Sequence, residues 1–345
     1  MSRLLPVTVA LLLGLAPITG QSTGTLIILN KNANTASLVD LASLAIVATL
    51  PTGAGPHEAA SSPDGNWAVV TNYGTGGAPG NSLTLINLAN QSIFRTHIMW
   101  NYHSPHGIVY LPGDKVLVTA EAEQALVRVD LGSGDVEQVL ISDQQMGHMV
   151  ALTPDGNRAF VANMGSGSVT AFDLLAGANL GSIQTGAGAE GIDVDPSGSE
   201  VWVANRDVDT ITILDAADLT VKDAFQSTGA PIRVKFTPDG QYVLLSNLRS
   251  GDVAVIAAAT RTEVARIDLN SPLPGEPKRR TFEATHGQRP APVGILIHPD
   301  GRTVYVATPN VDRVMVISTA TWQVVARITT GDNPDGMAYS ALVMK

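Results

Sequence analysis

The sequence predicts an all-β fold, a seven-bladed β-propeller of four-stranded antiparallel blades. Three observations indicate it: a turn of the Pro-Asp-Gly type recurs, four short strands fit between successive turns, and the two ends of the chain supply complementary parts of one blade. Three consecutive steps between turn prolines are 42 residues long, and the prolines are Pro63, Pro112, Pro154, Pro196, Pro238 and Pro299.

Each repeat contains the same elements in the same order. An apolar first strand ends at the turn, where proline presets φ, Asp follows and Gly accepts the exit geometry. The second strand is of the type "AFVAN" (159–163), and the third alternates, as in "SVTAFDL" (168–174). A fourth strand follows, as in "QVVARITTG" (323–331). The alternation predicts that the third strand has one buried face and one wetter face.

The ends of the chain are predicted to close the ring. Residues 25–51 supply only three strands, and the C-terminal "DGMAYSALVM" (335–344) supplies a lone first strand. We therefore expect the C-terminal strand to pair with the N-terminal blade, which leaves no free sheet edge. The predicted organisation is a signal peptide over 1–20 and a propeller over 21–345, with an insertion loop at 269–291.

Composition and the N-terminus limit the class of partner. The net charge of −10 opposes attraction to phosphate backbones, so we expect no nucleic-acid partner. Arg3, an apolar run and small residues near Gly20 predict a cleaved export signal, and no other segment is apolar enough to span a membrane. The chain has no cysteine, which excludes disulfides and thiolate metal sites. We expect a periplasmic or secreted monomer.

Four strand sequences carry a resemblance to a known family. They are "WAVVTNYG" (67–74), "AFVANMG" (159–165), "VWVANRD" (201–207) and "VYVATPN" (304–310). Their pattern resembles the repeat of the YVTN-type β-propellers, the YncE-like proteins of bacterial envelopes, and the resemblance spans nearly all of the mature chain. It implies the propeller fold. It leaves function open, because related propellers include surface-layer proteins, lactonase-like enzymes and streptogramin lyase-like enzymes.

Polar residues recur at the start of the innermost strand of each blade. Alignment on the turn proline places one residue per blade in this column: His57, His106, His148, Glu190, Ile232, Val293 and Asp335. Innermost strands line the central channel of a propeller. Five of the seven residues are metal ligands or acid–base groups by type, so the column predicts a polar ring at one mouth of the channel.

A second column follows the second strands and is predicted to lie on the same face. It contains Lys31, Tyr73, Glu121, Met164, Arg206, Leu248 and Pro309, and of these Lys31 and Glu121 are interpreted as rim charges. The longest connections, "NYGTGGAPGNS" (72–82) and the 269–291 loop, also belong to this face, where function is expected. Trp100 and Tyr102, in a neighbouring connection, either stack on an aromatic or sugar-like ligand or seal their loop onto the blade.

Two hypotheses of function remain open. The first is a binding or scaffold protein that presents the loop face to a small molecule, a glycan or a protein, with Lys31, Tyr73, Trp100, Tyr102, Glu121 and Asp335 as ligand contacts. The second is a metal-dependent lyase or hydrolase for a lactone or ester-like substrate. In it, a divalent ion such as Zn²⁺ is bound by three ring histidines, and three residues serve as base or as stabilisers of negative charge. The ligands would be His57, His106 and His148, and the catalytic residues Glu190, Arg206 and Arg233.

Each site hypothesis has a structural alternative. The histidines either hold the ion or line a water-filled channel, and the arginines either act on a ligand or form ion pairs with Glu190 or Asp335. Related propellers also imply a haem- or copper-linked role on channel histidines. This role ranks last, because the chain has no Cys-x-x-Cys-His motif to deliver electrons.

Overall fold

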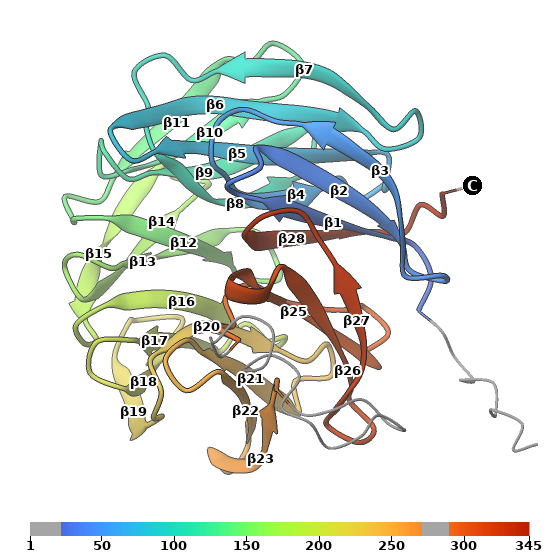
Figure 1. Cartoon of the computed structure of the whole chain (residues 1–345). Coiled ribbons are helices and arrows are strands. Elements are labelled where there is room, and N and C mark those ends of the chain that lie inside the picture. The colour runs from blue at the N-terminus through green and yellow to red at the C-terminus, as the bar shows by residue number, and fades with distance from the viewer. Residues whose placement is uncertain (1–21, 271–289, 345) are drawn as a thin grey trace, which may run out of the picture.

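The fold is a ring of seven antiparallel sheets, as predicted (Figure 1). The computed structural model describes residues 22–270 and 290–344, and in these residues twenty-eight strands form seven four-stranded sheets. The predicted leader over 1–20 and residues 271–289 of the insertion loop lie outside the described residues. In the described ranges, no helix has the length and hydropathy needed to cross a bilayer.

The first four blades contain the following strands. Blade 1 consists of β1 (Thr25–Asn30), β2 (Thr35–Asp40), β3 (Ala45–Pro51) and the last strand of the chain, β28 (Pro334–Ser340). Blade 2 consists of β4 (Pro56–Ser61), β5 (Trp67–Thr75), β6 (Ala78–Asn87) and β7 (Ser92–Ile98). Blade 3 consists of β8 (Pro105–Leu111), β9 (Lys115–Ala120), β10 (Ala125–Asp130) and β11 (Val136–Ile141). Blade 4 consists of β12 (Gly147–Leu152), β13 (Arg158–Asn163), β14 (Ser168–Asp173) and β15 (Ala178–Gln184).

The remaining three blades repeat the arrangement. Blade 5 consists of β16 (Ala189–Val194), β17 (Glu200–Asn205), β18 (Thr210–Asp215) and β19 (Val221–Gln226). Blade 6 consists of β20 (Pro231–Phe236), β21 (Tyr242–Asn247), β22 (Asp252–Ala257) and β23 (Thr262–Asp268). Blade 7 consists of β24 (Ile295–Ile297), β25 (Thr303–Thr308), β26 (Arg313–Ser318) and β27 (Gln323–Thr329), with a short 3₁₀ helix η1 (Pro309–Val311) after β25.

Pairing of the two ends closes the ring. β28 pairs antiparallel with β1, from Thr25 opposite Ser340 to Ile28 opposite Met337. Figure 1 shows the red C-terminal strand beside the blue N-terminal one. The main-chain groups of β1 that face β28 would otherwise form an exposed sheet edge. The predicted closure is confirmed.

The turn between the first and second strands has the predicted chemistry. In blade 4, the Gly156 N–H donates to the Thr153 carbonyl at 2.8 Å, and Gly156 has a φ of 70°. This left-handed conformation is accessible to glycine without steric cost. The Asp155 carboxylate accepts the Asn157 N–H at 3.0 Å, which stabilises the turn from within. The local sequence therefore specifies each hairpin, and the hairpin fixes the register of the first strand.

The third strands differ from the prediction of one buried and one wetter face. β14 is buried at the first five of its six residues, and β18 at its four central residues. Both faces of an inner strand pack on the neighbouring blades: the core between blades 4 and 5 contains Phe160, Val169 and Val203 from three different strands. Exposure is instead found on the fourth strands, such as β15, which form the outer rim.

The connection at 72–82 is ordered as a hairpin. β5 extends to Thr75 and β6 begins at Ala78, and these two residues are paired. Only Gly76 and Gly77 form the turn between them. The expected long loop of blade 2 is therefore an extension of two paired strands.

Candidate functional site at the channel mouth

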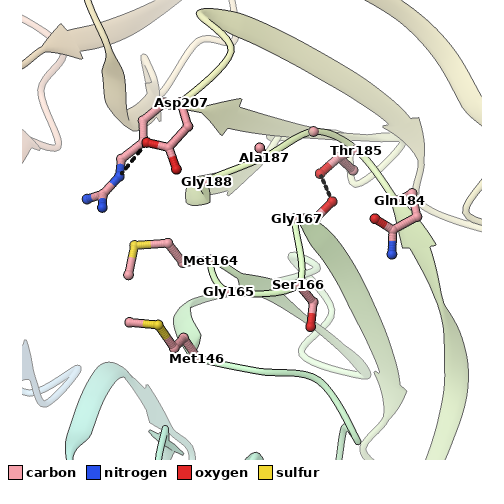
Figure 2. A pocket seen from close by; sticks show the side chains of 12 residues that line it. Met146, Met164, Gly165, Ser166, Gly167, Gln184, Thr185, Ala187, Gly188 and Asp207 are labelled. Carbon is pink, nitrogen blue, oxygen red and sulfur yellow. Dashed lines mark hydrogen bonds and ion pairs between the residues drawn. The ribbon is translucent and has the colours of Figure 1, made fainter.

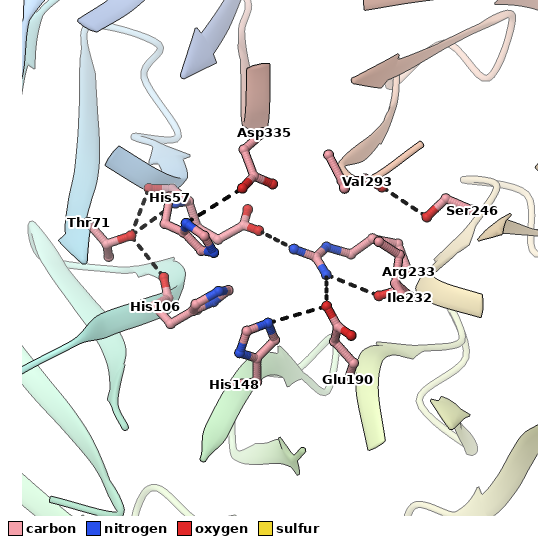
Figure 3. A network of polar contacts seen from close by, with 12 residues as sticks. His57, Thr71, His106, His148, Glu190, Ile232, Arg233, Ser246, Val293 and Asp335 are labelled. Atoms are coloured by element: carbon pink, nitrogen blue, oxygen red, sulfur yellow. Dashed lines mark hydrogen bonds and ion pairs between the residues drawn. The ribbon is translucent and has the colours of Figure 1, made fainter. Parts of the chain in front are cut away.

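The predicted polar ring lies at one position of the inner strands. His57, His106, His148, Glu190 and Asp335 are each the second residue of the first strand of their blade, and each side chain is buried. The first strands of neighbouring blades contact one another around the whole ring. The structure thus brings these side chains together at the channel, as Figure 3 shows.

A β-bulge at the ring position orients these side chains. In blades 2 to 6 the register between the first and second strand shifts at the ring position, for example between Gly147 and Met149 on either side of His148. Such bulges bend a strand and redirect a side chain. The next residue is often glycine: a Cβ on Gly107 would lie 2.7 Å from the His148 carbonyl oxygen, so glycine lets the adjacent blades approach.

Three imidazole rings lie against one another at the centre of the site, His106 edge-on to His57 and tilted against His148. The His106 ring centroid lies 4.0 Å from that of His57 and 3.6 Å from that of His148. His106 is fully buried, and neither of its ring nitrogens has a hydrogen-bond partner among the described residues. Burial lowers the pKa of His106 well below its usual value, and burial also lowers the pKa of His57 to about 3, against the attraction of Asp335. Both rings are therefore neutral at pH 7.

His148 differs in charge because two carboxylates face it. Its Nδ1 lies 2.6 Å from Glu121 Oε1, and its Nε2 lies 3.4 Å from Glu190 Oε1. Burial alone would lower the pKa of His148, but the hydrogen bonds to these carboxylates outweigh it and raise the pKa to about 9. His148 is therefore an imidazolium at pH 7, bridging blades 3 and 5.

Glu121 has a different place from the rim position predicted for it. It follows β9, is buried, and bonds His148 through Oε1, while its Oε2 accepts the Tyr73 hydroxyl proton at 2.7 Å. Tyr73 in turn stacks on His57 with a centroid separation of 5.1 Å. The rim interpretation is wrong because the side chain turns inward, toward the only charged imidazole among the three.

Arg233 crosses the channel between two carboxylates. Its Nη2 donates to Glu58 Oε1 at 2.9 Å and its Nη1 to Glu190 Oε1 at 3.2 Å (Figure 3). Arg206 donates to the other oxygen of Glu190 at 2.8 Å. Burial raises the pKa of Glu190, but the His148 hydrogen bond and both arginines outweigh it and lower the pKa to about 2. The two predicted catalytic arginines therefore form ion pairs with Glu190, as in the structural alternative.

Glu58 is the member of this network that was not singled out in the sequence. It is buried, and burial raises its pKa against the effect of Arg233. The signal was available, because Glu58 and Arg233 occupy the same position, one residue after the ring column, in blades 2 and 6. Most other blades have glycine there, so these two charges stand out.

Lys31 joins the ring from the second column. Its Nζ lies 3.5 Å from Asp335 Oδ2 and 3.4 Å from His57 Nε2. His57 Nδ1 lies 3.5 Å from the same Asp335 oxygen. Both predicted columns thus meet at one mouth of the channel, and Lys31 belongs to its ion-pair network as well as to its rim.

Two pockets open beside this network. One is lined by Met146, Met164, Arg206 and glycine-rich backbone of blades 4 and 5, and has a volume of about 620 Å³. Figure 2 shows the two methionine side chains turned toward the same space. The other has about the same volume, 620 Å³, and is lined by Lys31, Tyr73 and the blade 2 hairpin. We call them the Arg206 pocket and the Lys31 pocket.

The two aromatic residues of the connection between blades 2 and 3, Trp100 and Tyr102, have different surroundings. Tyr102 packs against the core formed by blades 2 and 3, which is the loop-sealing role. Trp100 is 78% exposed and has a φ of 49°, so it projects to solvent from a backbone conformation rare for this residue type. Nearby His103 pairs with Glu123 at 2.8 Å, outside the ring.

Comparison with known proteins supports the propeller. Residues 100–275 match the family described as Cytochrome D1 heme domain. Among solved structures, Kuenenia stuttgartiensis hydrazine synthase is 18% identical with a TM-score of 0.70, covering 86% of this chain and 93% of that chain. A functionally unknown protein from Desulfotomaculum acetoxidans is 15% identical with a TM-score of 0.74, covering 92% and 99%. At such identities the likeness extends to the fold alone. No curated protein matches.

The described residues of the channel mouth do not fit a haem. His106 has the free ring nitrogens that an axial ligand needs, but its ring is enclosed by those of His57 and His148 at 4.0 and 3.6 Å. Arg233 spans the same level of the channel. A flat macrocycle has no open face against His106 in this packing. Among the described residues, His106, His148 and Glu121 instead bring one ligand atom each within 4.8 Å of one another.

Proposed function

The chain belongs to the cytochrome D1 heme domain family, and within this propeller family we propose that it is a binding protein that holds a small anionic molecule at its channel mouth. One observation carries the proposal: the Arg206 pocket and the Lys31 pocket both adjoin the charged ring, and each is lined by one of the ring's outer cations. Volumes of about 620 Å³ suit small-molecule ligands.

The charges at the two pockets favour an acidic ligand. Arg206 is about one third exposed, and its Nε lies 3.3 Å from Asp207, whose side chain is 59% exposed. Lys31 is likewise about one third exposed. A ligand carboxylate can therefore reach either cation from solvent while the buried ion pairs stay in place. At each cation it would replace water or an exposed partner such as Asp207. Such charge-assisted bonds are roughly twice as strong as neutral ones.

The assignment to a YVTN-type, exported protein rests on the amino-acid sequence. The strand ends "VVTN" (69–72) and "FVAN" (160–163) support a YVTN-type, YncE-like protein, and the N-terminal segment supports export to a periplasm or to the medium. We propose that the exported protein acts as a monomer and presents this face to a small molecule rather than to a glycan or a protein.

Calorimetric titration of the metal-free protein tests the ligand class. Citrate, tartrate and galacturonate are the anionic probes, and glucose is the neutral control. We expect at least one acid to bind, and Arg206→Gln or Lys31→Gln to weaken it about tenfold or more. Arg249→Gln is the matched control, because Arg249 forms an exposed ion pair with Asp209 outside both pockets. Absence of binding, or equal affinity in all variants, would reject the proposal.

A metal-dependent lyase or hydrolase is the second candidate. It is favoured by the clustering of His106, His148 and Glu121. However, Glu190, its predicted base, is held by two arginines with a pKa lowered to about 2. A carboxylate whose pKa lies so far below neutral pH is a poor general base. We therefore place binding first.

A further inference from the structure

We propose that His106, His148 and Glu121 bind one divalent transition-metal ion, with Zn²⁺ as the best-suited ion. The three side chains come from β8, β12 and the residue after β9, and each offers a ligand atom within 4.8 Å of the others. All three are buried. The inference is independent of the anionic ligand proposed above, which is tested on metal-free protein.

His106 is the observation that points to a ligand. Its side chain is completely buried and both ring nitrogens lack hydrogen-bond partners among the described residues. Leaving a buried polar group unsatisfied is costly, and native structures rarely do so without a reason. A cation bound to one of these nitrogens removes the cost at that nitrogen, since neutral imidazole is a strong ligand.

The two other ligands already have the outer partners that metal ligands need. His148 Nε2 lies 3.4 Å from Glu190 Oε1, so Nε2–H orients the ring while Nδ1 faces the ion. Glu121 Oε2 accepts the Tyr73 hydroxyl proton at 2.7 Å and leaves Oε1 for the ion. Such outer hydrogen bonds hold ligand orientation and tune ligand basicity.

The charge of the site is compatible with a cation. His148 Nδ1 and Glu121 Oε1 share one hydrogen bond, with 2.6 Å between the two atoms. On metal binding, the proton of this hydrogen bond leaves to solvent and the metal ion takes its place between the two ligand atoms. The exchange of one proton for a dication adds one net positive charge, which the Glu121 carboxylate faces directly, while Glu190 is already paired with Arg206 and Arg233.

His57 is excluded from the ligand set, in contrast to the prediction from sequence. Its Nδ1 faces Asp335 at 3.5 Å, and its Nε2 lies 3.4 Å from the Lys31 ammonium. A metal ion at Nε2 would stand next to that fixed positive charge. His57 therefore packs against His106 as a neighbour of the site.

The donor atoms select the type of ion. Two imidazoles and one carboxylate are typical of Zn²⁺ and similar transition ions, whereas Ca²⁺ and Mg²⁺ prefer oxygen ligands throughout. Three protein ligands leave a further coordination position for water or a ligand atom. The site is therefore expected to resemble an open zinc site rather than a closed structural one.

Metal titration of a tag-free, chelator-stripped protein tests the inference. We expect about one equivalent of Zn²⁺ by plasma mass spectrometry, and a visible ligand-field band when Co²⁺ is added. His106→Gln and Glu121→Gln should lose both signals. Tyr73→Phe keeps all three ligands and should weaken Zn²⁺ binding by about 10-fold or more, the usual effect of losing an outer hydrogen bond.

Two controls define the ligand set. His103→Gln removes a histidine from a similar His–Glu pair, with 2.8 Å between His103 and Glu123, and should bind Zn²⁺ as the parent does. His57→Gln should also retain the ion. Loss of Zn²⁺ in His57→Gln, its retention in His106→Gln, or no stoichiometric binding in the parent would each overturn the assignment. If His106→Gln or Glu121→Gln does not fold by circular dichroism, Tyr73→Phe decides, because an unchanged affinity there overturns it.

Discussion

The charge on His148 predicts an unusual loss of stability at mildly alkaline pH. With metal removed by chelator, the imidazolium is held between Glu121 at 2.6 Å and Glu190 at 3.4 Å. Its pKa is raised from 6.5 to about 9. The contribution to stability is therefore complete below pH 6.5 and is lost as the pH rises through 9.

The magnitude follows from the shift. Each pKa unit corresponds to about 1.36 kcal/mol, so the free energy of unfolding should fall by about 3 kcal/mol between pH 6.5 and pH 9. His57 acts in the opposite direction: burial lowers its pKa to about 3, so its contribution is present above pH 6.5 and is lost as the pH falls toward 3. Stability of the metal-free protein should therefore be greatest near pH 6.5.

Urea denaturation followed by tryptophan fluorescence measures this profile from pH 5 to pH 9.5. The matched variant is His148→Gln, which keeps a side-chain N–H donor but has no charge to lose. We expect its profile to be flat between pH 6.5 and pH 9. A flat profile in the parent, or the same decline in His148→Gln, would refute the idea that a charged His148 stabilises the ring.

The other predictions concern ring closure and the buried ion pairs. Removal of the last ten residues, 336–345, takes away most of β28 and exposes the edge of β1. The melting temperature measured by calorimetry should therefore drop by at least about 10 °C. An unchanged transition would contradict closure by this strand. Arg233→Met leaves Glu58 and Glu190 buried without their shared cation and should cost about 3–5 kcal/mol in urea unfolding. Adding Glu58→Gln to that variant should restore part of the loss, and additive effects of the two substitutions would argue against a direct pair.

The repeat pattern was sufficient to predict the architecture. A Pro-Asp-Gly turn, with glycine at a positive φ as seen at Gly156, is a local structure that a few neighbouring residues specify. Its recurrence, in three consecutive steps of 42 residues, defines the blade. A lone C-terminal strand beside a three-stranded N-terminal set leaves ring closure as the solution without an open edge.

The ring of polar residues was also predictable, for the same reason. A fixed count from the turn proline selects one register position of the first strand, and every blade repeats that strand at the channel. His57, His106 and His148 were therefore expected to lie near one another. Glu58, one position further on, was within reach of the same argument.

The partners of each side chain were decided by tertiary structure. Glu121 and Tyr73 belong to different blades, and whether their side chains turn toward His148 or toward solvent depends on packing across the channel. Burial of both faces of β14 likewise depends on the neighbouring blades. The alternation of apolar and polar residues along one strand does not reveal that a second blade covers its other face. The sequence by itself determined the blades and the residues that ring the channel, because turns and strand registers are local. Only the folded ring decided which of these residues are charged, paired or free, because their pKa values and contacts depend on groups that are distant along the chain.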